Sequence, residues 1–391
     1  MTGPIKQNDS KITGQAQKEA KRAGYGYEGR EEFPVTQPYL PDRAKFRKYV
    51  NGIFARNWHT NNGPLVRELT DRLKDYLGIE NLLLVSNGTL ALQVAYRALG
   101  LLDNANPEAV TTPYSFVATA SSLKWEGITP VFADINGGTF CLDPNSAVRS
   151  ISSGARVIVP VHLYGNCCDV EAIEKLAQER NLKIIYDGAH AFGIRFRGES
   201  ILNWGDATTL SFHATKLFHT CEGGAIAFRR KEDLERARRI INFGIEGPEA
   251  IGPLGINAKM SEIHAAMGLC ILDDIDDILN ARAELCHKYE RLLGDYFGFP
   301  EWNPDATRNF SYFPIVFESE KELLAGRKSL ENLGIGTRRY FYPTLDTLPY
   351  LQPQPEQPVS RRLAERVLCL PLPAPGLFPE KVSHCLTARR T

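Results

Sequence analysis

Short apolar runs alternate with helix-like stretches over most of residues 34–269. Six of these runs have the length and composition of buried strands: residues 82–85, 130–133, 157–159, 182–186, 208–212 and 224–228. The stretches between them have helical periodicity, as in 89–99, where Leu90, Val94 and Ala98 fall on one face. Near-continuous apolar strands separated by helices are typical of a sheet that is covered on both faces. The pattern therefore predicts an α/β fold with a mostly parallel sheet flanked by helices.

The pattern changes after about residue 272. A long helix-like stretch runs over residues 275–296, and a shorter region with both helices and strands follows, in which 313–317 is a clear strand. We predict three parts: a polar, flexible leader over 1–30 that buries little, a large domain over 31–272, and a small α+β C-terminal domain over 273–391.

The charge balance of the chain bears on its partners. Lys and Arg number 46, and Asp and Glu also number 46, so the formal net charge is zero. Binding to nucleic acid or to an anionic membrane surface usually relies on an excess of basic residues. We therefore expect neither partner. The chain also lacks an apolar run of the roughly 20 residues that a membrane span requires.

The eight cysteines and the polar start of the chain bear on its compartment. The cysteines are scattered, none forms a Cys-x-x-Cys pair, and the adjacent Cys167 and Cys168 are poorly placed to bridge each other. Residues 1–21 are polar and charged and lack the apolar core of a secretion signal. We predict reduced thiols in a cytoplasmic protein, and no metal site.

Lys216 and Asp187 are the candidate catalytic residues. Asp187 ends the apolar run 182–186, and Lys216 follows the run 208–212 on a polar loop. A lysine amine can form a Schiff base with pyridoxal 5'-phosphate (PLP), and a carboxylate can keep the pyridine nitrogen of that cofactor protonated. The combination predicts a PLP enzyme in which Lys216 first binds the cofactor and then transfers protons.

A turn at the end of the first apolar run fits the phosphate of the same cofactor. Ser86, Asn87, Gly88 and Thr89 begin a predicted helix, where free backbone N–H groups and the helix dipole favour an anion. Gly88 permits close approach, and the Thr89 hydroxyl can donate a hydrogen bond. Ser211 is a further candidate for the phosphate.

Each of these signals also has a plainer interpretation. A cluster of Ser, Asn and Thr caps a helix, a strand-end Asp187 caps the next turn, and most lysines are solvated surface amines. His190, which we place near the ring hydroxyl of the cofactor, belongs to a residue type that is more often structural. The order of the three signals along the chain, each after an apolar run, favours the cofactor interpretation.

Ordered blocks over about residues 34–373 resemble the nucleotide-sugar aminotransferases of the DegT/DnrJ/StrS family. Besides the Asp187 and Lys216 motifs, the blocks are 60–64 (TNNGP), 86–92 (SNGTLAL), 113–119 (PYSFVAT), 161–165 (VHLYG) and 255–262 (GINAKMSE). The resemblance implies the PLP-dependent aspartate-aminotransferase fold (fold type I). Because Lys216 is retained where some members carry histidine and run a dehydration, the resemblance also implies transamination.

The resemblance implies roles for two further residues. Phe116 would stack on the cofactor ring and exclude water, and Asn257 would reach the phosphate from the neighbouring subunit. A homodimer with shared active sites follows from the second role. The cofactor-binding residues are then Gly88, Thr89, Phe116, Asp187, His190, Ser211, Lys216 and Asn257.

Within the family, the chain looks most like enzymes that make dTDP-4-amino-4,6-dideoxyglucose (viosamine type). Blocks 34–38 (PVTQP), 60–64 and 213–216 (HATK) are responsible for this likeness. Such enzymes aminate dTDP-4-keto-6-deoxyglucose with glutamate as the usual donor, and their cofactor alternates between PLP and pyridoxamine 5'-phosphate. Arg338, Arg339 and Tyr340 are candidate substrate-binding residues, and a surface charge pair is an equal alternative for the two arginines.

Several alternatives stay open from the sequence. Aminotransferases of 3-keto sugars share much of the same sequence, and a PLP-binding paralogue without turnover is a second possibility. A nicotinamide dehydrogenase is a third, but it would need a glycine-rich turn where residues 86–89 stand. The nucleotide, the stereochemistry and the role of residues 1–30 are not fixed. The pathway is open too, between a surface polysaccharide such as lipopolysaccharide O-antigen and a glycosylated natural product.

Overall fold

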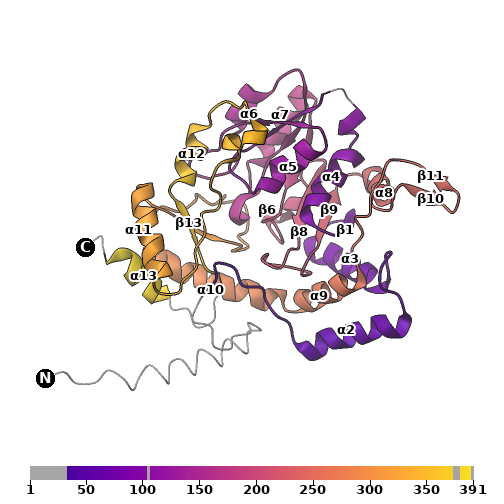
Figure 1. Cartoon of the computed structure of the whole chain (residues 1–391), viewed down its shortest axis with the longest axis horizontal. Coiled ribbons are helices and arrows are strands. Elements are labelled where there is room, and N and C mark those ends of the chain that lie inside the picture. Colours follow the sequence, from indigo (N-terminus) through magenta and orange to yellow (C-terminus); the bar gives the residue numbers. More distant parts are fainter. Residues whose placement is uncertain (1–32, 104–105, 373–378, 389–391) are drawn as a thin grey trace.

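A seven-stranded sheet forms the centre of the computed structural model, which describes residues 33–103, 106–372 and 379–388 (Figure 1). In sheet order the strands are β1 (Leu82–Val85), β9 (Gly224–Phe228), β8 (Ala207–Ser211), β5 (Lys183–Asp187), β4 (Ala155–Val159), β2 (Glu108–Thr111) and β3 (Thr129–Phe132). β9 is antiparallel to both neighbours, and the other adjacent pairs are parallel. The predicted mostly parallel α/β sheet is confirmed. The predicted leader 1–30 lies outside the described residues.

Successive residues of each central strand point to opposite faces of the sheet. In β1, Leu82 and Leu84 belong to one apolar cluster, whereas Leu83 and Val85 belong to another. All four side chains are buried, and burying a side chain of this size contributes about 1.5–3 kcal/mol. Burial on both faces explains why these strands read as continuous apolar runs instead of alternating ones.

Helices cover both faces of the sheet. The cluster that contains Leu83 includes residues of α4 (Gly88–Ala98), α5 (Val117–Trp125) and α8 (Lys231–Ile240). The cluster that contains Leu82 includes residues of α2 (Arg43–Arg56), α3 (Pro64–Leu77), α6 (Pro144–Ser150), α7 (Val170–Arg180) and α9 (Glu262–Asp273). Among the described helices, none combines the length and the apolar character needed to cross a membrane.

A third apolar cluster lies in the C-terminal part of the chain and includes Phe313, Ile315, Leu323 and Leu368. Its elements are α10 (Ile275–Leu293), β12 (Phe313–Val316), α11 (Glu320–Glu331), β13 (Val367–Leu370) and α13 (Pro379–Thr387), and β12 pairs with β13. α12 (Pro358–Ala364) precedes β13. The division predicted at residue 272 stays a prediction, and the junction of α9 and α10 lies beside it (Figure 1).

Short elements complete the described chain. Two are hairpins, β6 (Arg195–Phe196) with β7 (Glu199–Ser200) and β10 (Ile245–Gly247) with β11 (Ala250–Ile251). The second hairpin projects from the body of the molecule (Figure 1). The single-turn helices are η1 (Leu101–Asp103), η2 (Leu163–Gly165), η3 (Ile201–Asn203), η4 (Leu345–Thr347) and η5 (Pro349–Leu351).

The start of α3 depends on a buried carboxylate from a distant part of the chain. The N-cap position is Gly63, which has no side chain to offer. Glu262, which is fully buried, accepts hydrogen bonds from the backbone N–H groups of Leu65 (3.0 Å) and Val66 (2.9 Å). A Cβ at Gly63 would lie 2.6 Å from Cδ of Glu262. The carboxylate therefore joins α3 to α9, and Gly63 makes room for it.

Replacing Glu262 with glutamine should destabilise this junction. The amide would turn an N–H donor toward a backbone N–H and would remove a negative charge from a helix N-terminus. We expect Glu262→Gln to lower the free energy of unfolding by about 2 kcal/mol, measured by urea unfolding. Glu284→Gln, at an exposed position of α10, is the matched control. Equal unfolding midpoints for the two variants would contradict the assignment.

Candidate active site

Asp187 closes β5 and is almost fully buried. Its Oδ2 accepts a hydrogen bond from the Thr119 hydroxyl at 2.7 Å, and its Oδ1 accepts one from the Ala189 N–H at 3.1 Å. Asp187 thus caps the turn after its strand, as the plainer interpretation proposed. Both of these donors are neutral. A buried carboxylate with neutral donors offers a place for a cationic ligand group, because burying an unpaired charge is costly.

Lys216 follows β8 on a turn in which its backbone N–H donates to the His213 carbonyl. Its Nζ donates a hydrogen bond to the Tyr312 hydroxyl at 3.3 Å. Although the residue keeps some contact with solvent, burial of the amine lowers the pKa of Lys216 to about 8, and the negative charge of Asp187 opposes that shift. The amine is therefore closer to its neutral, nucleophilic form than an ordinary lysine is.

The turn after β1 meets the end of β8. Gly88 is the first residue of α4, and Asn87 caps the helix by accepting a hydrogen bond from the Leu90 N–H at 2.8 Å. A Cβ at Gly88 would lie 2.9 Å from Cβ of Ser211, so only glycine fits here without displacing Ser211. Gly88 and Thr89, in the first turn, have N–H groups without partners inside the helix. The structure brings Gly88, Thr89 and Ser211 to one edge of the sheet.

His190 is buried behind the same edge. Its Nδ1 accepts a hydrogen bond from the Tyr164 N–H at 3.1 Å, so the ring proton is assigned to Nε2. Burial, and after it the charge of Lys216, holds the pKa of His190 well below its ordinary value. His190 is therefore a neutral hydrogen-bond donor through Nε2. The predicted contact with a ring hydroxyl stays a prediction.

Phe116 and Thr119 come from the same turn of α5. Phe116 is the N-cap residue of that helix and is half exposed. Thr119, three residues later, donates to Asp187. The Phe116 carbonyl accepts a hydrogen bond from the Thr119 N–H at 3.1 Å, so one turn of backbone joins Phe116 to the residue that contacts Asp187. The ring centre of Phe116 lies 6.3 Å from that of Phe341. This placement suits an aromatic side chain that covers a planar ligand.

Asn257 lies one residue before Ala258, whose carbonyl accepts a hydrogen bond from the Ser86 N–H at 2.9 Å beside the turn that begins α4. It is exposed on the segment between β11 and α9 and forms an antiparallel bridge with Asn242. The lining of the small cavity beside Lys216 does not include Asn257. Its predicted contact across a subunit boundary stays a prediction.

The two candidate arginines differ in their surroundings. Arg339 donates to Glu320 at 2.7 Å, and its guanidinium lies 3.5 Å from the ring centre of Tyr342. These contacts favour a structural role for it. Arg338 is exposed and lies 4.8 Å from the ring centre of Tyr340. Of the two, Arg338 is the stronger candidate for a ligand phosphate.

Tyr114 and Tyr164 were not predicted as site residues. Their hydroxyls donate hydrogen bonds to the carbonyl of Tyr340 (2.9 Å from Tyr114), a buried residue that was predicted to bind substrate. These two hydroxyls also contact each other at 2.8 Å. Thr119 and Tyr312, which contact Asp187 and Lys216, were not predicted either. Tyr114, Thr119 and Tyr164 belong to blocks of the family resemblance, which was the one available signal.

The residues at this edge fit the predicted cofactor. A protonated ring nitrogen would give the Asp187 carboxylate the cationic partner that its neutral donors do not supply. The first turn of α4 offers free N–H groups beside Ser211, where a phosphate would bind. Lys216 has an amine of lowered pKa near the same carboxylate. The carboxylate of Asp187, the amine of Lys216 and the N–H groups of α4 therefore match the ring nitrogen, the aldehyde and the phosphate of PLP.

Comparison with known proteins tests the family. The model of the DegT/DnrJ/EryC1/StrS aminotransferase family matches residues 41–388. A Shigella dysenteriae protein named dTDP-4-amino-4,6-dideoxy-D-glucose transaminase is 44% identical over 347 residues, which are 87% of this chain and 94% of that protein. An Escherichia coli protein of the same name is 37% identical over 350 residues, 87% of this chain and 93% of that protein.

Among solved structures, DesI in the presence of its TDP-sugar product superposes with a TM-score of 0.85 and 31% identity over 93% of each chain. The predicted family, fold and cofactor class are confirmed by these matches. The chain belongs to the DegT/DnrJ/EryC1/StrS aminotransferase family and is a PLP-dependent sugar aminotransferase of the aspartate-aminotransferase fold.

Proposed function

We propose that this enzyme transfers the amino group of glutamate to a dTDP-linked 4-keto-6-deoxyhexose and so makes dTDP-4-amino-4,6-dideoxyglucose. The observation that carries the proposal is the amine of Lys216 beside the buried carboxylate of Asp187, at the edge where α4 begins. The substrate rests on the two relatives named dTDP-4-amino-4,6-dideoxy-D-glucose transaminase, which cover most of the chain.

The side chains at the site divide the work of a two-step amino transfer. When bound, PLP supplies an electron sink that stabilises the negative charge left when a proton leaves the carbon bearing nitrogen. Asp187 would hold the proton on the ring nitrogen. In the first step Nζ of Lys216 would take the proton from Cα of glutamate and pass it to the cofactor carbon, and in the second step it would move a proton from that carbon to C4 of the sugar. The amine would therefore act as base and then as acid in each step.

The surrounding residues hold the ligands in place and keep water out. The first turn of α4, with Gly88 and Thr89, binds the cofactor phosphate together with Ser211. Phe116 covers the ring face, and His190, as a neutral donor, binds the ring hydroxyl. Arg338 and Tyr340 lie at the sugar-nucleotide side, where a guanidinium suits a diphosphate. These roles orient the reacting carbon toward Lys216.

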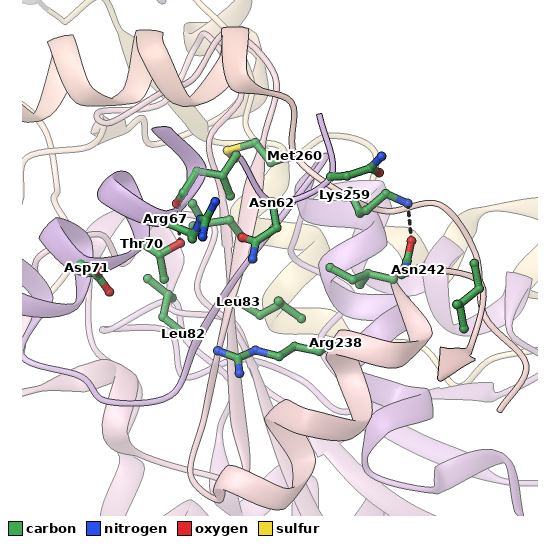
Figure 2. Close-up of a pocket in the computed structure, with 15 residues that line it drawn as sticks. Asn62, Arg67, Thr70, Asp71, Leu82, Leu83, Arg238, Asn242, Lys259 and Met260 are labelled. Atoms are coloured by element: carbon green, nitrogen blue, oxygen red, sulfur yellow. Dashed lines mark hydrogen bonds between the residues drawn. The ribbon is translucent and has the colours of Figure 1, made fainter. Parts of the chain in front are cut away.

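We infer a homodimer whose subunits share their active sites. The segment that carries Asn257 follows the projecting hairpin, where Phe243, Ile251 and Leu254 are exposed apolar side chains. Exposed apolar side chains in one region mark an interaction surface. A cavity of about 720 Å³ lies beside this segment, and its lining includes Asn242 and Lys259, whose side chains are hydrogen-bonded (Figure 2).

The residues that line this cavity support the proposal that a partner subunit covers it. Arg67, Arg238 and Lys259 line it together with one acid, Asp71, so the lining carries more positive than negative charge (Figure 2). Asn257 lies two residues before Lys259 in the chain. The cavity is separate from the small one that Lys216 lines. In the proposed dimer, the second copy covers this surface, and Asn257 reaches the cofactor phosphate of the partner.

The cellular setting is also a proposal. No disulfide joins any of the eight cysteines within the described residues, and six of the eight are buried, which suits a reducing compartment such as the cytoplasm. A dTDP-linked amino sugar is an activated donor for a glycosyltransferase. We therefore propose that the product feeds a surface polysaccharide such as the O-antigen of a lipopolysaccharide.

The substrate proposal is tested by supplying dTDP-linked 4-keto and 3-keto 6-deoxyhexoses with glutamate. We expect turnover of the 4-keto sugar and a product whose new C–N bond NMR places at C4. The 3-keto sugar should be consumed at least tenfold more slowly, because its carbonyl would lie one carbon away from the position that faces Lys216. Preferred turnover of the 3-keto sugar would overturn the proposal and favour the alternative left open by the sequence.

Replacing Lys216 with alanine tests the catalytic amine. We expect Lys216→Ala to lower kcat by at least about 10⁴-fold, because it removes both the covalent attachment and the proton carrier. Its thermal unfolding midpoint should stay near that of the wild type. Lys124→Ala, which replaces an exposed lysine of α5, is the matched control. Normal turnover by the Lys216 variant would remove the basis of the mechanism.

The pKa of Lys216 predicts a pH dependence for cofactor capture. The neutral amine attacks the aldehyde, and its fraction rises as the pH rises through the folded pKa of about 8, below the ordinary 10.5. The rate of PLP attachment to the cofactor-free protein should reach half of its plateau near pH 8. Borohydride trapping and peptide mapping measure it, and N-acetyl-lysine methylamide is the control. A plateau reached only above pH 10 would contradict the prediction.

Mixed dimers test the shared site. In a homodimer of either variant, Lys216→Ala or Asn257→Ala, both sites lack one native residue. A mixed dimer of the two variants has one site in which both native residues are present. Random pairing should restore about a quarter of wild-type activity at limiting PLP. Separately purified, unmixed variants are the control. A monomer in sedimentation analysis, or no recovery on co-expression, would argue against the shared site.

A further inference from the structure

The segment 309–312 is held rigidly against the loop that carries His190. Asn309, almost fully buried, donates its side-chain amide to the carbonyls of His190 (2.8 Å) and Phe192 (2.9 Å). The Ser311 hydroxyl contacts Oδ1 of Asn309 at 2.8 Å and the His190 carbonyl at 3.3 Å. Several hydrogen bonds thus fix a few residues of backbone just before β12.

The same segment is held from its other side by Arg282 of α10. This guanidinium is buried, and it donates to the carbonyls of Ser311 (3.2 Å) and Phe310 (3.4 Å). A buried cation without hydrogen-bond partners is costly. The two carbonyls are partners of the Arg282 guanidinium, so a displacement of this segment would be unfavourable. The next residue, Tyr312, therefore projects from a fixed backbone.

Tyr312 reaches the catalytic amine from that backbone. Its ring packs 4.5 Å from the His190 ring and 5.3 Å from the Tyr340 ring, measured between centres. Its hydroxyl accepts the hydrogen bond from Nζ of Lys216 at 3.3 Å, and Nζ lies 5.8 Å from the centre of the Tyr312 ring. Burial raises the pKa of Tyr312 far above the ordinary value, so the phenol stays neutral and accepts from an ammonium.

We propose that Tyr312 is a positioning residue that receives the amine of Lys216 whenever that amine is not bonded to the cofactor. The proposal rests on the proposed function, because amino transfer requires that the amine be released. With PLP bound, the C=N bond between Nζ and the cofactor carbon would be replaced by a C=N bond to the nitrogen of glutamate. The two hydrogens of that donor nitrogen would end on Nζ, which would leave as a free amine.

The released amine needs a defined position. A lysine side chain has four flexible carbon–carbon bonds, and an unanchored amine samples many rotamers away from the reacting carbon. A hydrogen bond to a fixed phenol keeps Nζ within reach for the proton transfer that follows. We expect this hydrogen bond also to stabilise the charged form of the amine in its buried place, in the same direction as the charge of Asp187.

Tyr312→Phe is the variant that tests the contact, since it keeps the ring and removes the hydroxyl. Tyr289→Phe is the matched control. Tyr289 is also buried, its ring lies 5.0 Å from that of Phe313, and its hydroxyl has no partner within the described residues. Both substitutions remove one buried phenol oxygen in the same part of the fold, but only one of those oxygens contacts Lys216.

Two measurements separate positioning from a structural role. The first is the pKa of Lys216 in the cofactor-free full-length chain, from acetic anhydride labelling across pH and mass spectrometry of the peptide with residue 216. The second is the rate of the single turnover with glutamate, followed by absorbance. Tyr312→Phe should lower the pKa of Lys216 and slow the single turnover about tenfold, since a hydrogen bond to a charged group is lost.

The outcomes distinguish this proposal from the proposed function. Tyr289→Phe should match the wild type in both measurements. A Tyr312→Phe protein with an unchanged Lys216 pKa and an unchanged single-turnover rate would overturn the role of Tyr312. A wild type that does not react with glutamate would instead overturn the proposed function, while the labelling of the cofactor-free chain would still report the contact.

A second variant covers the case in which Tyr312→Phe unfolds. Tyr312→His keeps an aromatic ring with a nitrogen that can accept a hydrogen bond from Nζ. It should fold and hold the pKa of Lys216 nearer to the wild-type value than Tyr312→Phe or Tyr312→Leu does. A Tyr312→His protein whose Lys216 pKa is as low as that of Tyr312→Leu would contradict the proposal.

Discussion

A buried carboxylate at the end of a central strand is the constraint on which the site depends. Asp187 receives its hydrogen bonds from a threonine hydroxyl and a backbone N–H, both neutral. Such a group is tolerated where a cation can approach it. Burial lowers the pKa of the nearby Lys216 by more than the charge of Asp187 raises it, so that pKa is about 8. The same carboxylate therefore prepares a place for a protonated ring and limits how far the lysine loses its proton.

The sheet brings the phosphate end of the site to this carboxylate. β9 is antiparallel to its neighbours and separates β1 from β8, so β1, β8 and β5 all end at the same edge. Glycine makes the close approach possible. A Cβ at Gly224 would lie 2.7 Å from the backbone of Asn87, and one at Gly88 would touch Ser211. The turn that we propose to bind the phosphate can therefore lie directly on the ends of its neighbours.

The fold could be predicted where a local sequence pattern has only one structural explanation. The run 82–85 is apolar because both faces of β1 are buried, and Asp187 stood out because it follows such a run. The strand Glu108–Thr111 was missed, because a charged residue and a threonine flank only two apolar ones. The reversed direction of β9 was not predicted, since an apolar strand looks the same in either direction.

The candidate site could be proposed from the sequence where its residue types are rare in their surroundings. It could not be proposed where its contacts are tertiary. Lys216 and Asp187 have unusual sequence surroundings. Tyr312 is one of 15 tyrosines, so its residue type alone does not indicate a functional role. Its position beside Lys216 depends on Asn309 and Arg282, which are distant from Lys216 in the sequence.

This dependence joins the two parts of the chain. Arg282 comes from α10, beyond the predicted boundary, and contacts the backbone that leads to Tyr312 beside the amine of Lys216. Asn309 fixes the same backbone to the loop of His190. Neither part can therefore complete the surroundings of Lys216 alone. A shift of α10 relative to the sheet would move the acceptor of the lysine before it moved Asp187, because Asp187 is held by α5 and its own turn.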